Sequence, residues 1–157
     1  MGCMTPPAFE IGSPAPTITA TLTDGSSFEL AELRGKYVLI DFWGSWCPPC
    51  IQEVPQVSAL YKNYMSQNYK NAQGFEILSI ALERNNETWK KTVRRHGMDW
   101  RYQIVDISRF VATSTIASSY GVKEIPSKFL LDPQGRIILI NGSLQDIRDI
   151  LDQNVKQ

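Results

Sequence analysis

The stretch VLIDFWGSWCPPCIQEVP, from Val38 to Pro55, decides the fold. A nearly unbroken apolar run from Tyr37 to Phe42 predicts a strand buried on both faces of a sheet, and Gly44-Ser45 ends it. Apolar residues then recur at three- and four-residue spacing, which is typical of one face of a helix: Val54, Val57, Tyr61 and Tyr64. The order is therefore strand, turn, cysteine-containing loop, helix.

Two cysteines, Cys47 and Cys50, stand at the start of this predicted helix. Unpaired backbone N–H groups and the positive end of the helix dipole favour a thiolate there, so Cys47 is interpreted as the attacking thiol. Cys50, one turn further on, can attack a mixed disulfide formed by Cys47. That second step would release a reduced substrate and leave an internal disulfide.

Two structural interpretations of the pair are less favoured. Half of a zinc site would need four ligands, and the other candidates, Cys3 and His96, do not stand at ligand spacing, so no metal is expected. A pair of buried core cysteines fits poorly with Trp46 before them and Pro48-Pro49 between them, because such a sequence favours a loop. Cys3 is interpreted as an incidental or processing-related thiol.

Asp41 is an acid within the predicted buried strand. Burial of a carboxylate is costly, so its pKa should rise, and a carboxylate that titrates near neutrality can take the proton from Cys50 as that thiol attacks. The alternative is a solvated aspartate at a sheet edge. We expect the catalytic role.

Further elements are predicted on both sides of this stretch. A hairpin is expected around Asp24-Gly25, a second parallel strand should complete a βαβ unit, and a later strand pair should be antiparallel. Helices are expected over 86–96, capped by Asn86, over about 111–120, and after Ser143. The predicted strands are Thr17–Leu22, Phe75–Leu82, Tyr102–Val105, Lys128–Leu131 and Arg136–Ile140. The fold class is α/β, with a flexible arm over 1–9 and one domain over 10–157.

Bulk composition excludes several classes of partner. The 157 residues carry 16 basic and 16 acidic side chains, so no net charge attracts the chain to nucleic acid or an anionic membrane. No window approaches the roughly 20 apolar residues of a membrane span, and no export signal is evident. The basic run Lys90, Lys91, Arg94 and Arg95 is expected to be a solvated helix face.

The segment Val38–Pro55, with IGSPAP…DGSSFELAELRGK upstream of it, resembles the active-site region of the thioredoxin superfamily, in its TlpA/ResA-type, redoxin-like branch. The similarity runs from about Glu10 to the C-terminus. Trp46 and the two cysteines match the WCxxC core, and Pro55 matches a proline that kinks the active-site helix. Asp41 falls where thioredoxin has its buried acid. The resemblance implies a thioredoxin-like mixed sheet flanked by helices, with an N-terminal hairpin extension.

The same resemblance implies roles for residues outside that segment. Ile125-Pro126 is similar to the cis-proline loop of the family, which would expose the backbone of Ile125 for pairing with a substrate peptide. Trp46, Pro48 and Pro49 would also face the substrate. Glu83 corresponds approximately to an acid near the active site of envelope-type members, the alternative being an ordinary charge at a strand end.

The expected activity is thiol-disulfide exchange, with protein disulfides as substrates, a dithiol protein as electron donor and no cofactor. By resemblance, the setting is the bacterial periplasm or cell envelope. Pro48 and Pro49 lack N–H donors that could stabilise the Cys47 thiolate, which predicts a reductase. The alternatives are a redoxin-type thiol peroxidase, which would want a Thr or Ser one turn before the thiol and an Arg near it, neither of which is evident, and a non-enzymatic binding module.

Overall fold

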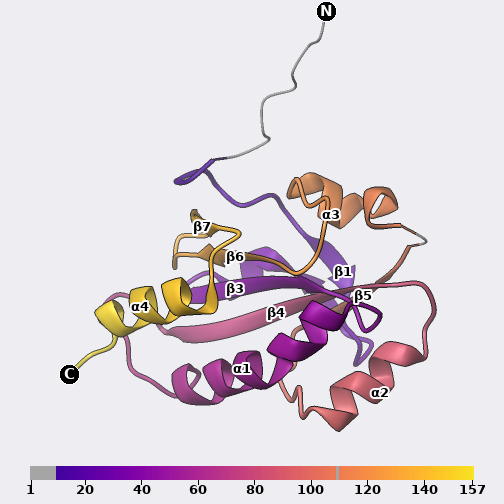
Figure 1. Ribbon diagram of the computed structural model, residues 1–157. Coiled ribbons are helices and arrows are strands. Elements are labelled where there is room, and N and C mark those ends of the chain that lie inside the picture. The colour runs from indigo at the N-terminus through magenta and orange to yellow at the C-terminus, as the bar shows by residue number, and fades with distance from the viewer. Residues whose placement is uncertain (1–9, 109) are drawn as a thin grey trace, which may run out of the picture.

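A five-stranded mixed sheet forms the centre of the molecule in the computed structural model, which describes residues 10–108 and 110–157 (Figure 1). The strand order is β5-β4-β3-β6-β7. The first three are mutually parallel, whereas β6 is antiparallel to both of its neighbours, so the expected βαβ unit and C-terminal hairpin are confirmed. The bounds are β3 Lys36–Trp43, β4 Gly74–Glu83, β5 Gln103–Ile107, β6 Ser127–Leu131 and β7 Ile137–Ile140.

Helices cover both faces of the sheet, as Figure 1 shows with α1 (Pro48–Tyr64) below it and α3 (Thr115–Ser119) above it. Successive side chains of β3 point to opposite faces, so Tyr37, Leu39 and Trp43 pack in the core with α1 and α4 (Leu144–Asn154). Val38, Ile40 and Phe42 pack in the other core, under α3 and the 3₁₀ helix η1 (Leu30–Leu33). Both faces of β3 are buried, as predicted.

The expected N-terminal hairpin is present with shorter strands, β1 (Thr19–Thr21) and β2 (Ser27–Glu29). Gly25 has a φ of 89°, which suits the predicted Asp24-Gly25 turn. The predicted flexible arm, residues 1–9, lies outside the described residues. The assignment of 10–157 to one domain stays a prediction.

The prediction for the helix α2 (Thr88–Arg95) is wrong at its start. Asn85, not Asn86, accepts the N–H groups of Glu87 and Thr88, at 2.9 and 3.1 Å, while the side chain of Asn86 accepts the indole N–H of Trp89. The helix ends before Gly97, at φ 63°, as expected. The predicted basic face is exposed: Lys90, Lys91, Arg94 and Arg95.

The single helix expected over 111–120 is also a wrong prediction, because Ser114 divides the segment. The Ser114 hydroxyl accepts the N–H of Ala117 at 3.1 Å and caps α3, so the 3₁₀ helix η2 (Val111–Thr113) ends before it. Ser143 caps α4 as predicted. Within the described ranges, each helix is too short or too polar to span a bilayer.

Candidate active site

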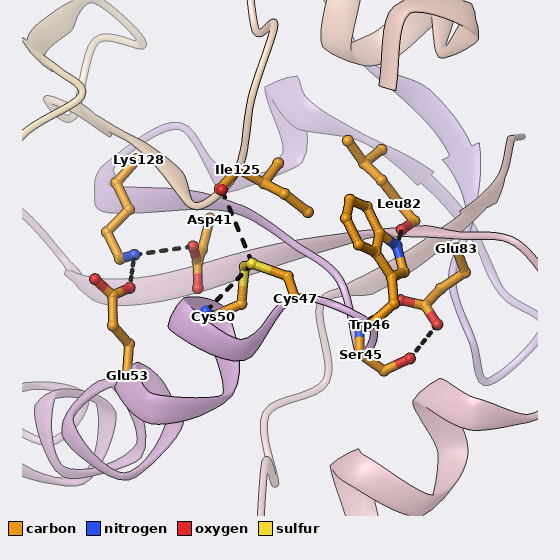
Figure 2. Close-up of a disulfide and its surroundings, with 10 residues drawn as sticks. All are labelled: Asp41, Ser45, Trp46, Cys47, Cys50, Glu53, Leu82, Glu83, Ile125 and Lys128. Atoms are coloured by element: carbon orange, nitrogen blue, oxygen red, sulfur yellow. Dashed lines mark hydrogen bonds and ion pairs between the residues drawn. A yellow bond between two sulfur atoms is a disulfide. The ribbon is translucent and has the colours of Figure 1, made fainter. Parts of the chain in front are cut away.

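Cys47 and Cys50 form a disulfide at the N-terminus of α1, with Cα atoms 5.3 Å apart (Figure 2). Cys47 is the N-cap residue, and its Sγ accepts the backbone N–H of Cys50 at 3.3 Å. Both cysteines are buried. The helix therefore places the first sulfur over its own N–H groups and the second sulfur one turn further in, as the sequence predicted.

The two prolines belong to the helix rather than to a loop, which corrects the interpretation of CPPC as a loop. Pro48 and Pro49 occupy its first two positions, where a missing N–H breaks no helical hydrogen bond. Both side chains are exposed beside the disulfide. A cap side chain accepts the N–H of the second or third helical residue. The second is Pro49, which has no N–H, so only Cys50 donates to the sulfur of Cys47.

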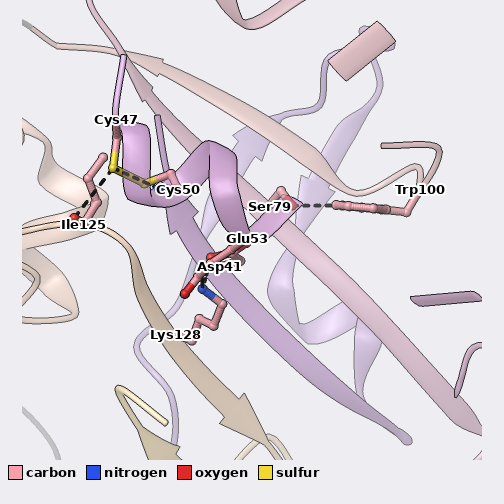
Figure 3. A network of polar contacts seen from close by, with 8 residues as sticks. All are labelled: Asp41, Cys47, Cys50, Glu53, Ser79, Trp100, Ile125 and Lys128. Carbon is pink, nitrogen blue, oxygen red and sulfur yellow. Dashed lines mark hydrogen bonds and ion pairs between the residues drawn. A yellow bond between two sulfur atoms is a disulfide. The ribbon is translucent and has the colours of Figure 1, made fainter. Parts of the chain in front are cut away.

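Asp41 lies in the centre of the sheet, on the face that α1 covers. Only 5% of it is exposed, which contradicts the solvated-edge alternative. Figure 2 draws its carboxyl group on the Cys50 side of the disulfide, and Figure 3 shows it in a cluster with Lys128 and Glu53. Burial raises the pKa of Asp41 from 3.8 to about 6, although the ammonium group of Lys128 lowers it. A buried acid with a pKa of about 6 therefore lies on the Cys50 side of the disulfide.

Lys128 joins Asp41 to Glu53 (Figure 3). It lies opposite Asp41 in the β3–β6 register, with its Nζ 3.3 Å from a carboxylate oxygen of Asp41, and it donates a hydrogen bond to Glu53. Burial alone would lower the pKa of Lys128, but the two carboxylates outweigh it and raise that pKa. Glu53 is partly exposed, so the cluster runs from the core to the surface.

Sequence reasoning missed Lys128 and Glu53. Two signals were available: Lys128 is a charged residue in an otherwise buried strand, as Asp41 is, and Glu53 follows Cys50 by three residues, which places both on one face of α1. Their pairing with Asp41 depends on strand register, which the sequence pattern alone did not specify.

Glu83 lies on the other side of the disulfide, at the end of β4 (Figure 2). It is 2% exposed, so it is not an ordinary strand-end charge. One carboxylate oxygen accepts the N–H of Ser45 at 2.7 Å and the other accepts its hydroxyl at 2.5 Å. Burial raises the pKa of Glu83, and these two hydrogen bonds partly offset the rise. Glu83 thus holds the loop that leads to Cys47.

The Ile125-Pro126 peptide bond is cis, as the family resemblance implied. The carbonyl oxygen of Ile125 lies 3.8 Å from the Sγ of Cys47. Ile125 and Pro126 are both partly exposed, so their loop borders the disulfide at the surface. Trp46, which precedes Cys47, is 39% exposed.

Within the described residues, no group of three or more His, Cys, Asp or Glu side chains is arranged to hold a metal ion. Cys3 lies outside those residues. The geometry is that of a dithiol site: two sulfurs in a disulfide, a buried acid on the side of the inner sulfur, and a partly exposed peptide edge beside the outer one.

A thioredoxin-like fold that carries such a pair at a helix start defines the class of thiol-disulfide oxidoreductases. A family model described as the AhpC/TSA family matches residues 11–140. The chain belongs to this family and, within the thioredoxin superfamily, to its TlpA/ResA type.

Similar proteins support this assignment. The thiol-disulfide oxidoreductase ResA of Bacillus thuringiensis (strain Al Hakam) is 31% identical over 129 residues, 82% of this chain and 68% of that protein. ResA of Bacillus subtilis (strain 168) is 29% identical over 86% of this chain and 69% of that protein. The thioredoxin domain of a thiol-disulfide oxidoreductase from Bacteroides vulgatus superposes with a TM-score of 0.77 at 28% identity, covering 92% of this chain and 97% of that one.

Proposed function

We propose that this thiol-disulfide oxidoreductase works as a reductase of protein disulfides. The Cys47 thiolate attacks a substrate disulfide, one substrate sulfur leaves as a thiolate, and a mixed disulfide forms. Cys50 then attacks the Cys47 sulfur, and the second substrate sulfur leaves. Two electrons pass to the substrate, and a dithiol protein must return them to the Cys47–Cys50 disulfide. The carrying observation is that this disulfide lies at the start of α1, with Cys47 as its N-cap residue.

Asp41 is proposed as the group that takes the proton from Cys50 during the second attack. Its support is threefold: the acid is buried on the α1 side of the sheet, it lies on the Cys50 side of the disulfide, and its pKa is raised to about 6. Glu53, at the surface end of the cluster, pairs with Lys128, so the ammonium group keeps a carboxylate partner when Asp41 takes up the proton.

The Ile125-Pro126 loop is proposed to hold the substrate peptide. The Ile125 carbonyl oxygen, 3.8 Å from the Cys47 sulfur, is placed to accept a hydrogen bond from an extended peptide whose cysteine is bonded to Cys47. The exposed side chains of Trp46, Pro48 and Pro49 would border that peptide.

The proposal that the protein reduces rather than oxidises its substrates rests on the N–H donors available to Cys47 at the start of α1. A thiolate at Cys47 receives an N–H from Cys50, but none from Pro49, so it is stabilised less than in strong oxidants of this superfamily. Less stabilisation of the reduced form means a lower reduction potential, nearer the roughly −270 mV of thioredoxin than the roughly −120 mV of DsbA.

The test is reduction of insulin disulfides by the reduced protein. Wild type and Cys3→Ser should be active, Cys47→Ser inactive, and Cys50→Ser should stop at a stable mixed disulfide with its substrate. Peroxide consumption, measured in parallel, should stay at background, because Gly44 stands one turn before Cys47 where a peroxidase would want Thr or Ser. Activity in Cys47→Ser, or rapid peroxide consumption, would contradict the proposal.

We propose the bacterial periplasm or cell envelope as the setting. The support is the family likeness to ResA, together with the need for a dedicated reductant in a compartment that is kept oxidising. Fractionation of cells that express the native gene tests this, with recovery in the cytoplasmic fraction as the contrary result.

A further inference from the structure

A small hollow of about 190 Å³ opens beside the exposed indole of Trp46. No residue of the Ile125-Pro126 loop lines it, so it extends the proposed peptide edge on the far side of Trp46, the residue that the two share. We name it the Trp46 groove. Its lining residues come from the loop before Cys47, the end of β4 and the segment after β5: Trp46, Leu82, Arg84, Ser108, Phe110 and Val111.

The wall formed by Trp46 is held in place. Its indole N–H donates to the carbonyl oxygen of Leu82 at 2.7 Å, and the guanidinium of Arg84 lies 4.7 Å from the ring centroid. A side chain at Gly44 would place its Cβ 2.7 Å from the indole nitrogen, so only glycine permits this packing. The groove is therefore preformed, with its indole wall directly before the attacking cysteine.

The groove combines apolar area with an available positive charge. Phe110 is 59% exposed and Trp46 39%, which makes them two of the few large apolar side chains at the described surface. Arg84 is exposed, and among residues 10–108 and 110–157 it makes no ion pair. The adjacent carboxylate, Glu83, is directed at Ser45 and buried. An acidic ligand would thus meet an unpaired cation at the edge of an apolar hollow.

We propose that the Trp46 groove binds the substrate protein next to its disulfide and selects a large apolar side chain that is followed by an acidic one. The apolar side chain would pack on Trp46 and Phe110, and the carboxylate would pair with Arg84. This inference rests on the proposed function, because the substrate cysteine must be bonded to Cys47 for its neighbours to reach the groove.

The test uses three synthetic peptides, each with one internal disulfide, that differ only in the two residues after the reactive cysteine: Leu-Asp, Leu-Lys or Ser-Asp. We expect wild type to reduce the Leu-Asp peptide with a kcat/KM about tenfold above either of the others. Arg84→Glu should reverse the preference between Asp and Lys, and Phe110→Ser should remove the preference for Leu over Ser.

Lys91→Glu is the matched control, since it makes the same change of charge on the exposed face of α2, outside the groove. It should keep the wild-type preference. If wild type does not distinguish the peptides, or if Lys91→Glu changes the preference as much as Arg84→Glu does, the groove is not selective and the inference is overturned.

Reduction of hydroxyethyl disulfide, which is too small to span Cys47 and the groove, separates this inference from the proposed function. Activity on that compound without discrimination among the peptides would overturn the inference about the groove but leave the proposed function standing. No activity on any disulfide would overturn the proposed function. Because each variant is compared with its own activity on the small disulfide, a loss of folding in Arg84→Glu is detected, and Phe110→Ser then provides the second test.

Discussion

The buried carboxyl group of Asp41 is proposed to act in only one of the two chemical steps, the attack of Cys50 on the mixed disulfide. It lies on the Cys50 side of the disulfide, so Asp41→Asn should slow the release of substrate from the mixed disulfide, by about 10²-fold at pH 7, without slowing the first attack by Cys47. Lys128 keeps Glu53 as a partner in this variant, so no cation loses its last carboxylate. Rapid mixing, with the two steps followed separately, measures both rates.

The pH dependence of the release step tests whether Asp41 is the group that takes the proton. Only the ionised acid accepts a proton, so the wild-type rate should rise with pH through about 6. Asp41→Asn should lose this inflection, whereas Asp99→Asn, which alters an exposed aspartate, should keep it. An unchanged inflection in Asp41→Asn would show that another group takes the proton.

Glu83 and Ser45 form the second residue-level test. Because a buried carboxylate loses a donor when Ser45 becomes Ala, the two side chains should be coupled in stability. Urea unfolding of Ser45→Ala, Glu83→Gln and the double variant should give a coupling energy of about 1–3 kcal/mol. Additive effects of the two changes would mean that the hydrogen bond from the Ser45 hydroxyl group to Glu83 contributes nothing to stability.

At the residue scale, the sequence predicted the positions of the two cysteines and the burial of Asp41, because those patterns are local. Cys47, Cys50 and the burial of Asp41 follow from short patterns, a CxxC at a helix start and an acid within an apolar run. Lys128 was missed because its role depends on lying opposite Asp41 in a neighbouring strand, 87 positions along the chain by their residue numbers. The identification of Pro126 depended on family resemblance, since an isolated X-Pro bond is expected to be trans.

At the scale of the element, the first turn of α1 determines how well a thiolate at Cys47 is stabilised. Pro49 stands at the second helical position, whose N–H normally reaches the cap. Pro49→Ala supplies that donor, so it should raise the reduction potential by roughly 30 mV, equivalent to about 1.4 kcal/mol. Equilibration with glutathione buffers measures the potential.

Pro48→Ala is the matched control for this prediction. It changes the first helical position, whose N–H does not reach the cap side chain, so its effect should be smaller. Equal shifts in both variants would show that loss of proline rigidity, rather than the added donor, sets the potential. A shift to lower potential in Pro49→Ala would contradict the capping argument.

Element boundaries show where local signals compete. Asn85 and Asn86 both have a side chain that can accept backbone N–H groups, and only the folded turn directs Asn85 to the N–H groups at the start of α2, whose N-cap residue is Glu87. The threonines and serines from Thr113 to Thr115 weaken a continuous helix, and Ser114 resolves the competition by capping α3. Long apolar runs gave β3 and β4 to within a residue or two, because burial on both faces leaves little alternative.

At the scale of the whole molecule, the parallel pairing of β3 and β4 and the antiparallel C-terminal hairpin could be predicted from the order of elements and the turn residues. The β3–β6 pairing is different. It is antiparallel and joins strands far apart in sequence, so only the complete sheet brings Lys128 beneath α1 with Asp41. The site thus depends on the global topology more than its short motif suggests.

That dependence predicts how global stability varies with pH. Folding raises the pKa of Asp41 from 3.8 to about 6, so the folded state holds the proton more tightly; this contribution is complete below about pH 4 and is lost as the pH rises through 6, a change of about 3 kcal/mol. Asp41→Asn has no such titration. Its free energy of unfolding, relative to wild type, should therefore increase by up to about 3 kcal/mol between pH 4 and pH 7.

Urea unfolding of both proteins in the disulfide form, in which the two cysteines do not titrate, isolates this effect. Glu76 and Glu83 also have raised pKa values, so their titration lowers the stability of the wild-type protein as the pH rises. Both residues are present in the two proteins, so their contributions cancel in the difference. A difference that stays constant from pH 4 to pH 7 would mean that Lys128 fully compensates the burial of Asp41, and that the acid is ionised well below neutrality. In that case Asp41 would be too weak a base to receive the proton of Cys50, so the equilibrium experiment also constrains the catalytic step.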